Sequence, residues 1–122
     1  MEFVLDSHAW LEYFAGNQKY QDYIEGPEVL PFTVSITLTE VIRSLLRKNK
    51  TAREIEAAVG FISSKSIILP VEKENAVAAG FIAEKEGLHF SDALIYSFAN
   101  PERKVVTGDP HFRKLPNAEF VA

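Results

Sequence analysis

Four acidic side chains stand where a carboxylate could do chemistry. Asp6 and Asp109 each close a short apolar run of strand character, "FVLD" and "VVTGD", while Glu40 and Asp92 stand near the starts of segments with helical spacing. Two carboxylates about 4 Å apart repel by about 4 kcal/mol at an effective dielectric constant of about 20, so four gathered acids require a counter-charge. Because oxygen ligands select hard cations, the four acids suggest a site for Mg²⁺ or Mn²⁺.

These acids also have purely structural interpretations. Asp109 precedes a proline, as a helix N-cap often does. Thr37 to Glu40 has the S/T-x-x-E form of a capping box, and a pair between Glu40 and Arg43 is a further alternative. Asp92 would be favoured at a helix N-terminus by the helix dipole. The functional interpretation rests on the set of four, none of which has an obvious fixed Lys or Arg partner.

Strand-like and helix-like segments alternate along the chain and must position these acids. Apolar runs of strand length lie at 3–5, 28–34, 66–71, 104–109 and 118–122. Helical spacing is found at 8–16, 18–26, 35–49, 51–65, 72–87 and 91–100. Parallel strands need crossover helices that cover both faces of the sheet. The pattern therefore predicts an α/β fold, a three-layer α/β/α sandwich with a mostly parallel central sheet of four to five strands.

Such a fold would bring the first and last acids together. In open α/β sheets, binding sites lie outside the carboxyl ends of the strands, which is where Asp6 and Asp109 would stand. The predicted helix at 72–87 carries a face of small residues. That face could pack on the sheet or on a second subunit, and packing on the sheet is the simpler expectation.

Composition limits the class of protein. The chain has 122 residues, of which 47% are hydrophobic and 25% charged, and we expect one globular domain spanning 1–122. The absence of cysteine excludes disulfides and thiolate metal sites. Without a signal peptide or a long apolar span, a soluble cytoplasmic protein with no membrane association is expected.

Charge argues against one class of nucleic-acid binder but not against local contacts. The formal net charge of -4 disfavours a protein that coats nucleic acid through a broad positive field. Basic residues nevertheless gather in two places: Arg43, Arg47, Lys48, Lys50 and Arg53, and Arg103, Lys104, Arg113 and Lys114.

Four stretches in this order carry a resemblance: "VLDSHAWLEYF", "TLTEVIRSLL", "SDALIYSFA" and "VVTGDPHF". Over essentially the whole chain they resemble the PIN-domain ribonucleases of the small VapC toxin type. The resemblance implies one or two Mg²⁺ or Mn²⁺ ions held by four acids, namely Asp6, Glu40, Asp92 and Asp109. The hydroxyls of Ser7 and Thr107 would lie near them, and Asp109 would either bind the metal or orient the attacking water.

The resemblance further implies a metal-dependent ribonuclease that hydrolyses phosphodiester bonds of single-stranded RNA, as an endonuclease rather than an exonuclease. Basic side chains would hold the RNA backbone at Arg43 and Arg47 or at Arg113, and His111 could contact a phosphate. Proteins of this type work as homodimers and are silenced by a small antitoxin whose segment enters the acidic groove. We therefore expect RNA, a cognate antitoxin and a second copy of the chain as partners.

Other classes share part of the pattern. A signalling receiver domain has aspartates at one edge of a similar sheet, but it needs adjacent acids after the first strand, and here Ser7 follows Asp6. An Asp-x-Asp phosphatase is disfavoured because His8 occupies the second acidic position. A catalytically silent PIN-like RNA-binding or adaptor module is a further alternative.

Overall fold

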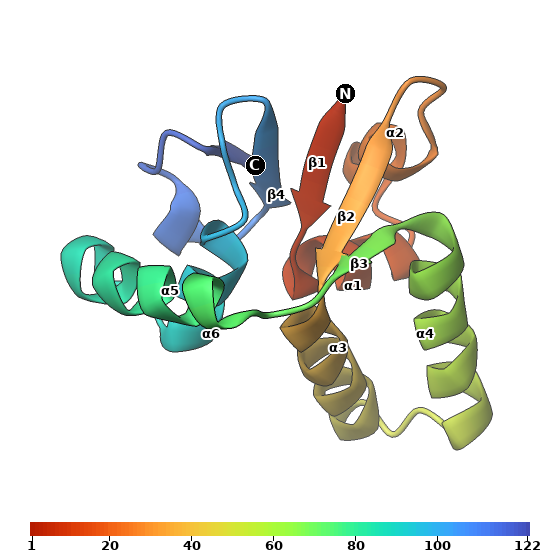
Figure 1. Cartoon of the computed structure of the whole chain (residues 1–122). Coiled ribbons are helices and arrows are strands. Elements are labelled where there is room, and N and C mark those ends of the chain that lie inside the picture. The colour runs from red at the N-terminus through yellow and green to blue at the C-terminus, as the bar shows by residue number, and fades with distance from the viewer.

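The computed structural model describes residues 1–122 and places a five-stranded sheet between two layers of helices (Figure 1). The strands are β1 (Glu2–Leu5), β2 (Leu30–Val34), β3 (Ile67–Leu69), β4 (Arg103–Thr107) and β5 (Ala118–Phe120). Neighbouring strands all pair in parallel. The predicted α/β sandwich with a parallel sheet is confirmed, and the sheet has five strands.

Helices connect the strands where the apolar spacing predicts them. They are α1 (Ser7–Phe14), α2 (Gln21–Glu25), α3 (Ser35–Arg47), α4 (Ala52–Lys65), α5 (Lys73–Glu86) and α6 (Phe90–Tyr96). Two short 3₁₀ turns, η1 (Gln18–Tyr20) and η2 (Pro110–Phe112), precede α2 and follow β4. The segment predicted as one helix at 18–26 is thus divided between η1 and α2. None of these helices combines the length and the apolar character needed to cross a bilayer.

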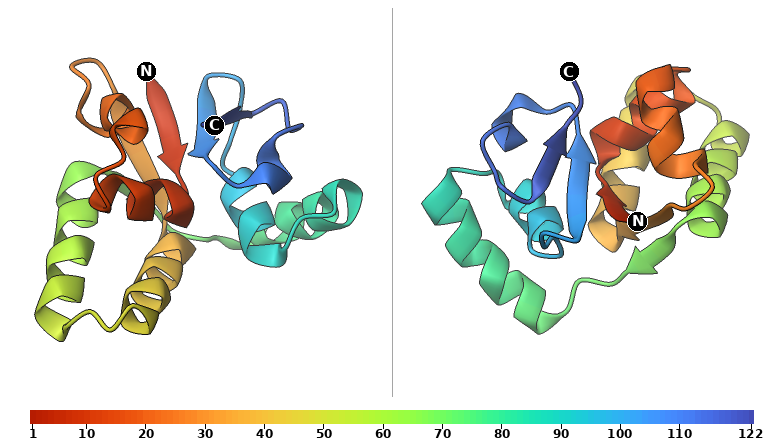
Figure 2. Two further views of the ribbon diagram at one scale, coloured as in Figure 1. Left: turned by 180° about the vertical axis from the view of Figure 1, so that it is seen from behind. Right: turned by 90° about the horizontal axis from the view of Figure 1, so that it is seen from above.

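The sheet is buried on both faces, which explains why each of its central strands contains successive apolar residues. Phe3 and Leu5 of β1 pack with Trp10 in a cluster built largely from α1 to α4. Val4, which points to the other face, packs with Phe112 and with side chains of α5 and α6. Both views of Figure 2 show α5 and α6 on the side opposite α1 and α4. Ala79 of the small-residue helix is buried in this second cluster.

The strand order places a binding edge at the middle of the sheet. The order is β3-β2-β1-β4-β5, so the chain moves outward from β1 in one direction and then returns to the other side of β1 with β4. The carboxyl ends of β1 and β4 flank this switch point, where open α/β sheets bind ligands. Receiver domains have the order 2-1-3-4-5. The receiver alternative is therefore wrong.

Candidate active site

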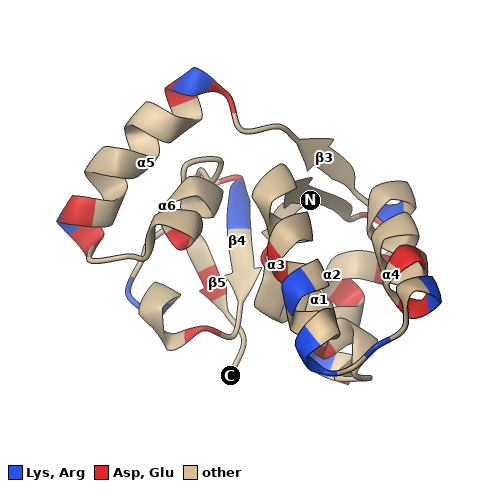
Figure 3. Cartoon of the chain, turned by 90° about the horizontal axis from the view of Figure 1, so that it is seen from below, with Lys and Arg blue, Asp and Glu red and all other residues tan.

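The four predicted acids come from four elements that end or begin at one edge of the sheet. Leu5 of β1 is in register with Val106 of β4, so Asp6 follows β1 just where Thr107 ends β4. Glu40 lies in α3, which follows β2, and Asp92 lies in the first turn of α6. Figure 3 looks onto this edge and shows the acidic positions of α3 and α6 on turns beside the end of β4.

Asp6 is the most buried of the four acids, with 4% of its surface exposed. Its Oδ1 accepts a hydrogen bond of 2.8 Å from the backbone N–H of Ala9 and so caps α1. Burial, together with the negative charges of Asp92 and Glu40, raises the pKa of Asp6 to about 7 against the opposing hydrogen bonds of Thr107 and Ala9. No cation offsets the charge of this buried carboxylate.

One carboxylate oxygen of Glu40 accepts a hydrogen bond, and the other has no partner. Ser91 Oγ donates to Glu40 Oε2 over 3.1 Å, whereas Glu40 Oε1 is buried without a hydrogen-bond partner. The capping-box interpretation is wrong, because α3 begins at Ser35 with Val34 as its N-cap. No ion pair joins Glu40 to Arg43 either. A buried carboxylate oxygen without a partner is costly, and a bound cation would satisfy it.

Asp92 lies within electrostatic range of two of the other acids. Burial, together with the charges of Asp109 and Glu40, raises the pKa of Asp92 to about 6, and the charges of His89 and His111 act in the opposite direction. The charges of Asp92 and Glu40 also raise the pKa of Asp6. The structure therefore brings all four predicted acids within electrostatic reach as one cluster.

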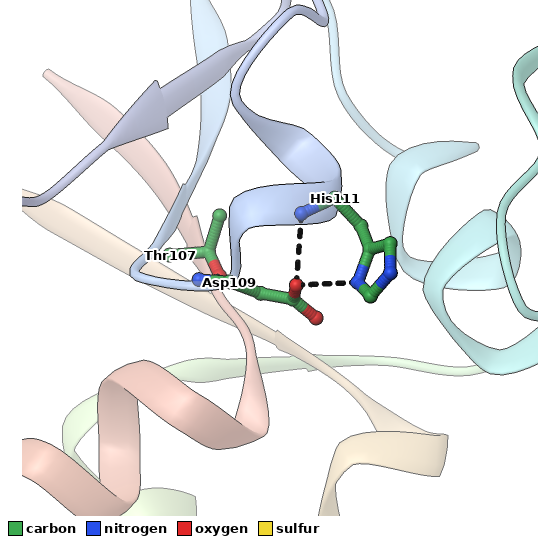
Figure 4. Close-up of polar contacts among 3 residues, drawn as sticks. All are labelled: Thr107, Asp109 and His111. Carbon is green, nitrogen blue, oxygen red and sulfur yellow. Dashed lines mark hydrogen bonds and ion pairs between the residues drawn. The ribbon is translucent and has the colours of Figure 1, made fainter.

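Asp109 caps the turn that follows β4 (Figure 4). Its Oδ1 accepts a 2.9 Å hydrogen bond from the backbone N–H of His111 and lies 2.8 Å from His111 Nδ1. The backbone N–H of Asp109 donates to Thr107 Oγ1 over 2.9 Å. The N-cap interpretation of the Asp-Pro pair is confirmed. Because both contacts use Oδ1, the cap does not occupy the second carboxylate oxygen.

Gly108 lets the chain pass close to the first helical layer. A Cβ atom at this position would lie 2.5 Å from the Tyr20 hydroxyl and 2.5 Å from His8 Cε1. Tyr20 is buried, and its hydroxyl lies 3.4 Å from His8 Nδ1. Tyr20 and Gly108 therefore fix the turn that carries Asp109. Sequence analysis missed both, because their contact joins distant segments and leaves no local pattern.

The remaining predicted residues divide into two groups. Ser7, Arg43 and Arg47 line a hollow of about 330 Å³ that also reaches Glu40. Arg113 lies elsewhere, with its guanidinium 4.5 Å above the Phe120 ring. The first basic group thus adjoins the acids, whereas Arg113 is engaged at β5. Ser91, which orients Glu40, was not predicted, although it directly precedes Asp92 in the sequence.

The donor set fits a hard divalent cation by charge and chemistry. No three of the Asp, Glu and His side chains are arranged as ligands around a common point. The cluster nevertheless combines four carboxylates, an unpartnered buried oxygen of Glu40 and the raised pKa values of Asp6 and Asp92. Burial of the carboxylates and repulsion between them cause the raised pKa values, and a bound divalent cation would offset both effects and occupy the free oxygen of Glu40.

Solved structures of low sequence identity share the fold. A toxin-antitoxin complex from Klebsiella pneumoniae matches with a TM-score of 0.76 and 18% identity, over 97% of this chain and 96% of that chain. VapBC2 from Rickettsia felis, bound to a DNA fragment of its promoter, matches with a TM-score of 0.76 and 19% identity, over 99% and 98%. VapC20 from Mycobacterium tuberculosis, a toxin that cleaves the sarcin-ricin loop, matches with a TM-score of 0.63 and 18% identity, over 79% of each chain.

Comparison by sequence gives the family. No curated protein sequence matches the chain. The family model described as the PIN domain matches residues 3–118, which include all four acids and every strand except the first residue of β1 and the end of β5. The predicted family is confirmed: the chain belongs to the PIN-domain family.

Proposed function

We propose that this protein is a metal-dependent ribonuclease that cuts single-stranded RNA internally and serves as the toxin of a toxin-antitoxin pair. One observation carries the proposal: four carboxylates, none of them paired with a Lys or Arg, gather at the switch point of a PIN-domain sheet. A structural cluster would be expected to pair its buried charges, whereas this cluster leaves Glu40 Oε1 without any partner.

Asp6, Glu40 and Asp92 would hold Mg²⁺ or Mn²⁺, directly or through water, and Asp109 would either join them or orient the attacking water. The bound ion would acidify a water molecule and offset charge that develops on the phosphate. Ser91 would keep one oxygen of Glu40 fixed, leaving Oε1 for the ion. Thr107 would hold the Asp109 turn through the backbone hydrogen bond that it accepts. No nucleophilic side chain is required.

Binding of the RNA backbone would fall to the basic turns of α3. Arg43 and Arg47 line the hollow that reaches Glu40, so a phosphodiester chain held there would pass beside the acids. His111 is exposed and contacts Asp109, which places its ring at the rim of the same edge. Ser7, in the same hollow as the two arginines, would contact the bound backbone or the metal's water ligands. We assign no RNA contact to Arg113, which lies over Phe120.

The likeness to the toxin-antitoxin complexes supports a toxin role and an antitoxin partner. We propose that a cognate antitoxin covers the acidic edge with a basic segment and so silences it in the cytoplasm. We also propose that two copies of the chain form the active particle. A tight complex with the product of a neighbouring short gene, formed on co-expression, would support the first proposal. A mass of two chains in light scattering would support the second.

Cleavage of an unstructured RNA oligonucleotide tests the central proposal. We expect internal cuts with Mg²⁺ or Mn²⁺ and none with EDTA. Asp92→Asn should lose most of the activity while keeping its fold. The matched control Glu56→Gln removes one negative charge from the exposed face of α4 and should leave the rate unchanged. A folded protein that binds RNA but never cuts it would favour the silent adaptor instead.

A further inference from the structure

Phe90 is a large aromatic side chain that the fold does not use. It is 63% exposed at the first residue of α6 and belongs to neither core cluster. Its ring contacts that of His89, with centroids 4.7 Å apart and an interplanar angle of 36°. His89 is itself exposed and caps α6 through Nδ1. The two residues therefore present a pair of adjoining ring surfaces to solvent.

This aromatic pair lies at the rim of the acid cluster. Phe90 is followed by Ser91, whose hydroxyl donates a hydrogen bond to Glu40. Asp92 comes next, and the charges of Glu40 and Asp109 raise its pKa. The charge of His89 lowers the pKa of Asp92, so the His89 ring lies within electrostatic range of that carboxylate. His89, Phe90 and Asp92 thus lie in the N-cap and first turn of the same helix.

The two sides of the site differ in the kind of contact that they offer a nucleotide. On the α3 side, Arg43 and Arg47 carry fixed positive charge. On the other side, α6 contains no Lys or Arg, and its exposed features at this end are aromatic. Phosphate contacts are therefore concentrated on α3. A nucleotide that extends past α6 would instead contact the exposed aromatic rings of His89 and Phe90.

We infer that Phe90, supported by the His89 ring, is a stacking platform for an unpaired nucleobase next to the scissile phosphate. This inference rests on the proposed ribonuclease function and adds a substrate-binding residue to it. Bases of single-stranded RNA stack on exposed aromatic rings with little sequence preference, because every base has a π face. A paired base is already stacked within its helix. The platform therefore favours RNA that is single-stranded at the cleavage point.

Affinity for a short RNA tests the platform. The probe is a fluorescein-labelled unstructured 12-nucleotide RNA, titrated by anisotropy with Ca²⁺ in place of Mg²⁺ over a range of salt concentrations. Phe90→Ala should weaken binding by roughly five- to a hundredfold, Phe90→Leu should weaken it nearly as much, and Phe90→Trp should restore it. Phe81→Ala is the matched control, since Phe81 is 77% exposed on α5 and lines surface hollows that none of the four acids reaches.

The salt dependence separates stacking from charge. Phe90→Ala should shift the plot of log affinity against log salt without changing its slope. Arg43→Gln should instead reduce the slope by about 0.7, the value expected for one phosphate contact on a single strand. Unchanged affinity in Phe90→Ala, or full affinity in Phe90→Leu, would overturn the stacking platform. Metal-dependent cleavage by the parent protein would then still stand, whereas a parent that neither binds nor cuts RNA would end both proposals.

Discussion

Replacing Asp6 with Asn should make the metal-free protein more stable at neutral pH, although the residue is almost completely buried. Burial and the charges of Asp92 and Glu40 raise the pKa of Asp6 from 3.8 to about 7. A difference of this size between the unfolded and folded states corresponds to about 4 kcal/mol of unfavourable free energy once the group is ionised. Asn keeps an oxygen that can accept the Ala9 hydrogen bond, so the cap of α1 is retained.

The pH dependence follows from the direction of this pKa change. Well below pH 3.8 the Asp6 carboxyl is protonated in both states and does not affect the free energy of unfolding. As pH rises toward 7, the unfolded chain releases its proton while the folded protein retains it, so the folded state loses stability relative to the unfolded state. Asp92, with a pKa of about 6, contributes in the same direction. The advantage of Asp6→Asn should therefore be small at pH 4 and reach its full size near pH 8.

Thermal melts in EDTA at pH 4, 6 and 8 measure the effect. Burial of the Asn amide offsets part of the gain, so we expect about 2–3 kcal/mol at pH 8, or on the order of 10 °C in Tm. Glu56→Gln on exposed α4 is the control and should leave Tm unchanged. Mn²⁺ should stabilise the parent protein and stabilise Asp6→Asn less. A variant no more stable than the parent at pH 8, or equally stabilised at pH 4, would refute the uncompensated-charge account.

Two further predictions concern the packing that supports the site. Gly108→Ala should destabilise the protein by about 1–3 kcal/mol in chemical denaturation, because its Cβ would lie 2.5 Å from the Tyr20 hydroxyl; wild-type stability would contradict this close approach. Thr33→Val should cost about 1–3 kcal/mol, because Thr33 Oγ1 accepts from Trp10 Nε1 at 3.0 Å and contacts Ser66 Oγ at 2.7 Å in the core. An unchanged denaturation midpoint would show that a water or another group replaces it.

The fold was predictable because its elements are locally encoded. Residues 3–5 are all apolar and residues 105–106 are adjacent valines, which indicates strands covered on both faces, and the helices show apolar residues at helical spacing. Helix boundaries were less certain from sequence. The helical spacing at 35–49 agrees with the start of α3 at Ser35, whereas the capping-box pattern at Thr37 to Glu40 would begin the helix later in the chain; strand β2 ends directly at Val34.

The site was predictable only as a set of acids. Their positions after strands or at helix starts are visible in the sequence, and so is the basic stretch that begins at Arg43. The contacts that orient them are not, since Ser91 meets Glu40 and Tyr20 meets Gly108 across large separations in the chain. Only the folded arrangement of the sheet creates these neighbours. Tertiary contacts of this kind produce no periodic pattern in the sequence from which they could be predicted.

The central position of β1 has a consequence for protein synthesis. β1 is made first, whereas its partner on one side, β4, is made only after β2 and β3. A nascent chain that lacks β4 and the turn after it has Asp6, Glu40 and Asp92 but no Asp109, and one edge of β1 has no neighbouring strand. The acidic edge is therefore completed only after β4 and its following turn have left the ribosome. A nuclease built in this order cannot assemble its full set of acids before the turn that carries Asp109 has been made.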